Sequence, residues 1–421
     1  MATATLTTPR ENFGLGRHLA LASFWFGLNY HWIPILVILI PGRVAKLLPD
    51  QQGLGIGAIT GVGAIFAMVL PPLVGYWSDK LATPYGRRRP IMAIGTAGNV
   101  VGLLILMVAP NYWVLMAGYV VIQIFNNSAG AAFNAVVPDV VPTGEFGKAS
   151  GILGAMVQVG SVAGLATVIF TDKVLHNTQL TYAFIAVVIV LTLLPTLWAS
   201  KGEGLVPVES KPALPRGEAI ARFLAPLRGG DFAWVIYTRT FITAGIYTVL
   251  PFLLLFFKNV VMVKDPESYT AFWQLALLLA ATPFGLAGGW ISDRFGRKIF
   301  VYLSGAAQSL VLLVFIILFP HDQNFVLLLG IFYGVGYGLY YAVDWALACD
   351  TLPDPEHSAK DMGLFHVAFT LPQVLLPSIA GPILDLFNHR SPNSGYRVIF
   401  SASIAFYVIG TVLVSRIKSV R

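Results

Sequence analysis

Apolar residues along this chain are gathered in long runs, and short polar stretches separate one run from the next. A run of about 20 apolar residues is long enough to cross a bilayer as a helix. We count twelve such runs, six in each half of the 421 residues. They cover residues 19–40, 54–78, 91–109, 112–136, 149–170, 181–199, 232–257, 270–291, 299–319, 325–348, 362–387 and 396–414. The pattern predicts an all-α membrane protein with twelve transmembrane helices in two six-helix bundles.

The polar stretches contain a pattern that occurs twice, about half the chain length apart. The first copy is Gly75, Trp77, Ser78, Asp79, Gly86, Arg87, Arg88 and Arg89, and the second is Gly289, Trp290, Ser292, Asp293, Arg294, Gly296, Arg297 and Lys298. Segments that begin at Asp139 and Asp350 repeat at nearly the same offset. The chain therefore reads as a tandem duplication, which is typical of alternating-access transporters. We place the bundles at residues 1–200 and 232–421, joined by a proline-rich, charged linker at 201–231.

Composition supports a membrane location. Hydrophobic residues make up 56% of the chain and charged residues only 11%, against about 25% in soluble domains, and the mean hydropathy is +0.74. We expect a multi-pass protein of the cell membrane. Most Lys and Arg residues fall in the loops of one side, which predicts that both termini are cytoplasmic. Because this bias explains the net charge of +7, we expect no nucleic-acid partner. The first run is too long for a cleaved signal peptide, so we expect the first helix to remain part of the mature protein.

Motifs of soluble enzymes are missing from the sequence. It has no phosphate-binding Gly-x-x-x-x-Gly-Lys loop, no His-Glu-x-x-His and no Gly-x-Ser-x-Gly. We therefore expect no catalytic residues, no metal site and no cofactor. Cys349 is the only cysteine, so an internal disulfide is excluded. Pairs of glycines four residues apart predict close helix packing, namely Gly57 and Gly61, Gly160 and Gly164, and Gly334 and Gly338.

Both copies of the repeated pattern lie where helices two and three, and eight and nine, are expected to be joined. They resemble the cytoplasmic loop signature of major facilitator superfamily transporters. The resemblance covers essentially the whole chain and implies the major facilitator fold, alternating access and a small-molecule substrate; we expect a monomer in the lipid bilayer. We assign gating to the charged residues Asp79, Arg87, Arg88, Asp139, Asp293, Arg297 and Asp350. The alternative is that these charges only enforce topology.

Within the superfamily, the loop from Gly86 to Pro90 is similar to that of the sucrose-carrier and glycoside-pentoside-hexuronide:cation symporter branch. Asn126 and Asn127, followed by the stretch that ends at Asp139, also resemble that branch. One departure is Asn134, which stands where plant sucrose carriers have an arginine. The resemblance therefore implies a sugar or glycoside without identifying it.

Helices one, four, seven and ten line the central cavity in this family, so the resemblance directs attention to their polar residues. Amides can bond hydroxyl groups, and aromatic faces can stack on a sugar ring. The candidate substrate-binding residues are Asn29, His31, Gln123, Asn126, Asn127, Tyr337 and Tyr341. The same residue types also serve helix packing and interfacial belts.

Arg239 and Asp344 are the ionisable residues that lie deepest in the expected membrane. At 1.5 Å per residue they lie about 10 Å and about 6 Å from the same surface, so they share a depth at which they can pair. A buried ionisable residue suggests function, and we assign proton coupling to the two; a permanent structural ion pair is the alternative. The sequence thus predicts proton-coupled symport of a sugar or glycoside. Efflux of an amphipathic drug or metabolite is the alternative, and a non-transporting sensor on the same fold is a distant third.

Overall fold

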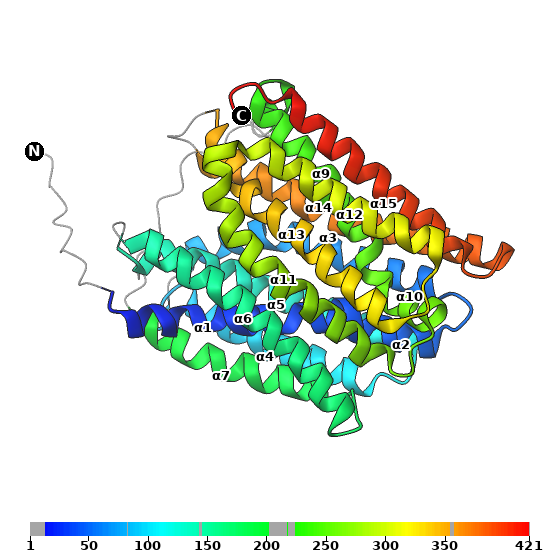
Figure 1. The fold of residues 1–421 in the computed structure, drawn as a ribbon. Coiled ribbons are helices and arrows are strands. Elements are labelled where there is room, and N and C mark those ends of the chain that lie inside the picture. The colour runs from blue at the N-terminus through cyan, green and yellow to red at the C-terminus, as the bar shows by residue number, and fades with distance from the viewer. Residues whose placement is uncertain are drawn as a thin grey trace, which may run out of the picture. The chain divides into compact units, whose positions relative to one another are not determined.

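The structure of the protein is a computed structural model, and every regular element in its described residues is helical (Figure 1). The described residues are 13–81, 83–142, 145–201, 217, 224–353 and 358–420. The long helices are α1 (Leu15–Ile33), α3 (Gln52–Lys80), α4 (Arg89–Val108), α5 (Tyr112–Val140), α6 (Phe146–Lys173), α7 (Leu180–Ala199), α9 (Asp231–Val249), α11 (Pro266–Phe295), α12 (Arg297–Leu318), α13 (Gln323–Asp350), α14 (Ser358–Arg390) and α15 (Ser394–Leu413).

Twelve helical stretches in the described part of the chain are long and apolar enough to cross a membrane, which confirms the predicted number. Two of them are longer than expected because short irregular segments extend them. After α1 the chain continues through a π-helical segment, Pro34–Leu39, into α2 (Ile40–Leu47). After α9 it continues through Leu250–Phe252 and α10 (Leu253–Phe256) into the π-helical segment Phe257–Val261. Proline cannot donate the backbone hydrogen bond of a regular helix, and Pro34 and Pro251 lie in these irregular segments.

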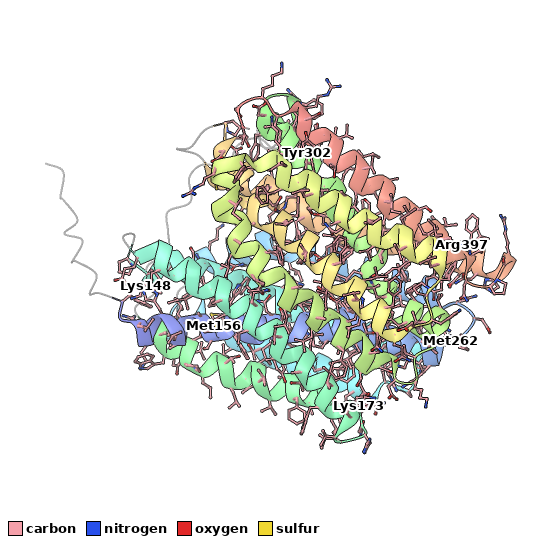
Figure 2. All side chains as sticks on the ribbon, viewed as in Figure 1. Lys148, Met156, Lys173, Met262, Tyr302 and Arg397 are labelled. Carbon is pink, nitrogen blue, oxygen red and sulfur yellow. The ribbon has the colours of Figure 1, made fainter. Side chains whose placement is uncertain are left out.

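Polar and charged side chains mark the helix ends. Lys148 and Lys173 lie near opposite ends of α6, with Met156 between them (Figure 2). Asn111 caps α5 by accepting a hydrogen bond from the Val114 amide at 3.0 Å. Asp322 likewise accepts the first amides of α13. The two capping side chains satisfy amide groups that have no partner within the helix. The lysines keep charge near the membrane surface.

The helices gather into two compact units. The first unit comprises Met1–Ile33, Val69–Gly164 and Gln179–Glu209, and the second comprises Pro34–Met68, Leu165–Thr178 and Ser210–Arg421. The second unit thus contains two segments of the first half of the chain. The bundles at residues 1–200 and 232–421 stay a prediction, and residues 202–216 and 218–223 of the predicted linker lie outside the described residues.

Each unit has its own apolar core. In the first unit Phe133 of α5 packs against Phe24 and Trp25 of α1, with ring centroids 5.7 Å and 5.5 Å away, and α1 also lies alongside α7 (Figure 1). In the second unit Phe232 of α9 and Val343 of α13 belong to one buried cluster. Both clusters draw on helices far apart in sequence, so each unit is held together by long-range packing.

Close packing of α11 against α13 depends on a stripe of glycines. A Cβ added at Gly330 would meet the Trp273 indole nitrogen at 2.5 Å, and one at Gly334 would lie 2.9 Å from the Leu277 carbonyl carbon and closer still to its oxygen. Gly338 makes an equally close approach to Ala281. These contacts confirm the packing role predicted for Gly334 and Gly338, because no larger residue fits without moving backbone.

We predict that Gly334→Ala lowers the free energy of unfolding by about 1 to 3 kcal/mol, since the added methyl group overpacks the α11 interface. A matched control is Gly154→Ala in α6, where nothing lies within 4 Å of the added Cβ. There the change should be neutral or stabilising by up to about 1 kcal/mol, because alanine favours helix more than glycine does. Thermal unfolding of the purified variants in detergent measures both. Equal shifts of the two midpoints would contradict the packing account.

Candidate functional site

An ion pair between Arg239 of α9 and Asp344 of α13 is buried within the second unit. The Arg239 guanidinium bonds Asp344 Oδ2 directly, and the Tyr340 hydroxyl donates to Asp344 Oδ1 at 2.8 Å. The two side chains are only 11% and 7% exposed. The structure therefore brings together the two residues whose depth predicted a pair. Their role in proton coupling stays a prediction.

Aromatic rings of α14 cover the guanidinium of this pair. The Arg239 Cζ atom lies 3.8 Å from the Phe365 ring centroid and 5.2 Å from that of Phe369. A cation over an aromatic face is stabilised by the ring quadrupole, more so where water is excluded. The Arg239 Nε atom is buried and has no hydrogen-bond partner among the described residues. Residues of α9, α13 and α14 thus make up or contact the ion pair. The Arg239 Nε–H group remains a hydrogen-bond donor without a partner among the described residues.

Tyr340 and Tyr341 of α13 lie close to the same pair. The rings of Tyr337 and Tyr341 have centroids 4.5 Å apart, and Tyr341 is 39% exposed and close enough to Arg239 to interact electrostatically. Tyr333, one helical turn before Tyr337, instead bonds Tyr407 of α15 at 2.5 Å between hydroxyl oxygens. The candidate residue Tyr341 therefore lies near the ion pair and Tyr337 lies against Tyr341, whereas Tyr333 joins two helices.

Amides of the first unit form a second polar cluster. Asn99 of α4 donates to Asn126 Oδ1 at 3.1 Å, and Asn127 donates to Gln123 Oε1 at 2.6 Å. His31 is fully buried with Asn126 as its polar neighbour, and its ring stacks on Trp32 at 4.8 Å between centroids. The structure thus brings together four of the predicted residues of this unit.

Asn29, the remaining candidate of the first unit, makes a local contact instead. Its side-chain amide donates to the Trp25 carbonyl one turn earlier at 2.8 Å. Asn99, Phe365 and Phe369 were not predicted from the sequence. A polar residue inside the third apolar run was a signal for Asn99, but aromatic residues in an apolar run carry no such signal.

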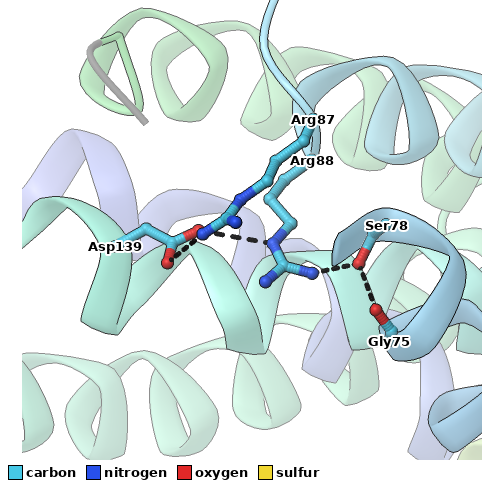
Figure 3. Close-up of polar contacts among 5 residues, drawn as sticks. All are labelled: Gly75, Ser78, Arg87, Arg88 and Asp139. Atoms are coloured by element: carbon cyan, nitrogen blue, oxygen red, sulfur yellow. Dashed lines mark hydrogen bonds and ion pairs between the residues drawn. The ribbon is translucent and has the colours of Figure 1, made fainter. Parts of the chain in front are cut away.

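Three of the predicted gate residues, Arg87, Arg88 and Asp139, lie together in the first unit (Figure 3). Arg87 Nη2 bonds Asp139 Oδ1 at 2.8 Å, and Arg88 Nε lies 3.3 Å from Asp139 Oδ2. Arg88 also donates to the Ser78 hydroxyl, which in turn donates to the Gly75 carbonyl at 2.8 Å. Both arginines are only 5% exposed. The loop after α3 is thereby fastened to the end of α5.

The second copy of the pattern repeats this contact in the second unit. Arg297 Nε bonds Asp350 Oδ2 at 2.7 Å, between the start of α12 and the end of α13. Here the Arg297 and Asp350 side chains are 20% and 38% exposed. Each copy of the pattern that repeats in the sequence thus contributes an arginine–aspartate ion pair to its unit. The side chains of Asp79 and Asp293 lie outside the described residues.

A further contact in the first unit was not predicted. Glu145, before α6, accepts hydrogen bonds from the His18 imidazole at 2.7 Å and from the Phe13 amide at 3.0 Å. These bonds, the histidine's above all, hold the pKa of the Glu145 carboxyl below its ordinary value. The beginning of α1 is therefore tied to the segment that follows α5.

Twelve apolar helices in the described part of the chain, with buried polar clusters and ion pairs at corresponding helix ends, are those of a multi-pass membrane protein. The chain belongs to the Major Facilitator Superfamily, a family of transporters and not of enzymes, whose family model matches residues 19–280 and 266–420. A solved structure of the nucleoside transporter NupG has a TM-score of 0.73 at 15% identity, covering 96% of this chain and 98% of that one. This similarity shows that the fold is shared.

Two sequence relatives with different named functions match parts of the chain. The class G tetracycline resistance protein of Vibrio anguillarum is 30% identical over 141 residues, or 33% of this chain and 34% of that protein. A sucrose transport protein of Arabidopsis thaliana is 23% identical over 180 residues, or 38% of this chain and 35% of that protein. The chain thus matches only about a third of the length of each.

We predict that the two copies of the repeated ion pair contribute unequally to stability. Removing the carboxylate by Asp139→Ala leaves two buried guanidinium groups without it, which should cost about 3 kcal/mol or more. The matched change Asp350→Ala breaks a solvent-exposed pair and should cost less than about 1 kcal/mol. Thermal unfolding in detergent compares the two variants. Similar losses would show that burial does not decide the strength of these pairs.

Proposed function

We propose that the protein is a secondary active transporter that carries a sugar or glycoside together with protons. The observation that carries the proposal is the buried Arg239–Asp344 pair, which has an unused donor at Arg239 Nε and the ring of Tyr341 near it, itself in contact with the ring of Tyr337. A hydroxyl-rich ligand can accept from the free donor and present its apolar face to the rings. A buried donor gains most from such a ligand, because leaving it without a partner is costly.

The amide cluster of the first unit supports a neutral substrate. Gln123, Asn126 and Asn127 offer both donors and acceptors, and no Asp, Glu, Lys or Arg belongs to the cluster as described. Amides of this kind bind hydroxyl groups without requiring a charge on the ligand. The similarity to a sucrose transport protein agrees with this chemistry.

Coupling to protons follows from the cost of an unpaired charge in the membrane. While Arg239 and Asp344 are paired, both charges are compensated. A movement of α9 away from α13 would leave the carboxylate alone, and burying an isolated charge there costs several kcal/mol. Binding a proton removes that charge. In our proposal, protonation of Asp344 therefore accompanies the change of state that moves the substrate.

Efflux of an amphipathic drug or metabolite is the second candidate, because the tetracycline resistance protein is 30% identical over its matched segment. The rings of Tyr337 and Tyr341 in the second unit would also suit an amphipathic ligand. The two candidates differ in substrate class and direction. A ligand screen separates them without assuming either.

We predict that purified protein is stabilised against thermal unfolding by sugars or glycosides, and that proteoliposomes accumulate the stabilising ligand under an inward proton gradient. Asn126→Leu should weaken binding by about 0.5 to 2 kcal/mol, the value of one uncharged hydrogen bond. Asn259→Leu is a control, since that amide bonds Tyr396 at 2.9 Å at a helix end and should leave affinity unchanged. Export of lipophilic cations with no saccharide binding would favour efflux.

We predict that Asp344→Asn abolishes accumulation driven by a pH gradient but preserves substrate binding and counterflow exchange. The neutral amide cannot take up a proton, whereas exchange requires no net proton movement. Asp322→Asn is the matched control, because Asp322 caps the same helix at its exposed end and should retain accumulation. If Asp344→Asn still accumulates substrate, coupling lies elsewhere, with His31, His366 and Asp139 the next candidates, or uses another ion.

A further inference from the structure

Within the second unit, a carboxylate of α14 caps the beginning of α3. Asp385 Oδ1 accepts the Gly53 amide at 2.9 Å, and Asp385 Oδ2 accepts the Leu54 amide at 2.7 Å. The first amides of a helix have no partner inside the helix and carry its positive dipole end, so an anion is favoured there. Such caps normally come from the residue just before the helix. Here the cap comes from a residue more than 300 positions away, so it joins two helices.

Below the cap, α3 and α14 are packed backbone against backbone. A Cβ added at Gly57 would lie 2.5 Å from the Pro377 carbonyl oxygen, and one at Gly61 would lie 3.1 Å from the Ser378 Cβ. The Ser378 hydroxyl donates to the Gly57 carbonyl at 3.1 Å. Glycines at 53, 57 and 61 therefore form one face of α3 that fits α14 without space for a side chain or a water molecule.

Two ion pairs between first-half and second-half segments of this unit use exposed lysines. Lys46 bonds Glu267 at 3.4 Å with 66% of its side chain exposed, and Lys173 bonds Asp265 with 43% exposed. Exposed ion pairs of this kind contribute little to stability. A carboxylate bonded to two backbone amides loses less side-chain entropy and gains charge-assisted bonds. The cap that Asp385 forms is therefore stronger than either of these lysine ion pairs.

Solvent reaches the cap from a polar cavity of about 300 Å³. Asp385 lines this cavity together with Asp50, Asn388 and His389. When α3 and α14 part, water from the cavity can hydrate both the freed amides and the carboxylate. The contact is thus both strong when closed and able to open without leaving an unsolvated charge.

We propose that Asp385 is a positioning residue for transport: it is a latch that holds α3 against α14 and must release before this side of the second unit opens. The side concerned is the one that the distribution of Lys and Arg predicts to face outward. The proposal rests on the transport function proposed above, and it assigns to Asp385 control over how often that side opens.

The test uses the full-length protein with Cys349→Ser as background and Ser378→Cys as a reporter inside the latch. A water-soluble maleimide should label the reporter on the order of tenfold faster after Asp385→Asn, because a neutral acceptor weakens the cap by about 1.4 kcal/mol. Asp385→Glu should restore slow labelling in part. Asp50→Asn, which changes an exposed carboxylate of the same cavity, should leave labelling unchanged.

A purely structural role would loosen the whole unit. Ser403→Cys measures this, because Ser403 is a buried serine that bonds the Gly245 carbonyl at 2.7 Å between α15 and α9. Its labelling should not change with Asp385→Asn. Equal acceleration at both reporters, or none at Ser378→Cys, would overturn the proposal.

A second variant leaves Asp385 intact. Gly61→Cys with Ser378→Cys should form a disulfide, since the added Cβ would lie near the Ser378 Cβ and disulfides need about 3.8 Å between Cβ atoms. The crosslink should arrest substrate exchange, and reduction should restore it. Exchange that continues through the crosslink would overturn the latch. The labelling test requires no substrate, so failure of the sugar proposal would leave its result intact.

Discussion

The pairing of Arg239 with Asp344 is the interaction on which the polar interior of the second unit depends. A carboxylate without a partner is costly at that depth, so Asp344 must stay paired with Arg239 or take up a proton. The Tyr340 hydroxyl donates a hydrogen bond to the other oxygen of the Asp344 carboxylate, and the ring of Phe365 of α14 covers the Arg239 guanidinium. Three helices therefore share one electrostatic constraint, and any movement among them changes its cost.

The two units divide the chemistry differently although the chain is duplicated. Both carry an arginine–aspartate contact at corresponding helix ends, and the contact is buried in the first unit and half open to solvent in the second. In the membrane interior, by contrast, the first unit presents amides around Asn126, and the second presents the ion pair with its tyrosines. In our proposal both units contact the hydroxyl groups of the substrate, whereas only the second unit responds to protons.

The sequence predicts this structure best for features that the lipid bilayer constrains directly, such as the length of a helix and the depth of a charge. The length of apolar runs predicted the twelve helices, and depth along a helix predicted that Arg239 and Asp344 can meet. The repeat directed attention to Asp139 and Asp350, but their pairing with arginines was not predicted. Sequence did not predict which neighbour faces a given side chain, because depth says nothing about the rotation of one helix against another. Asn99, Phe365 and Asp385 were missed for that reason.

The most direct test of the account is to measure proton exchange when substrate binds, using purified protein in weakly buffered detergent solution and a saccharide that stabilises it. If Asp344 responds to the same movement that binds substrate, the wild-type protein should take up protons on binding, and Asp344→Asn should bind the saccharide without a change of pH. Proton uptake that is the same in both proteins would contradict the coupling role of Asp344. Saccharide binding without proton exchange in the wild-type protein would contradict it as well.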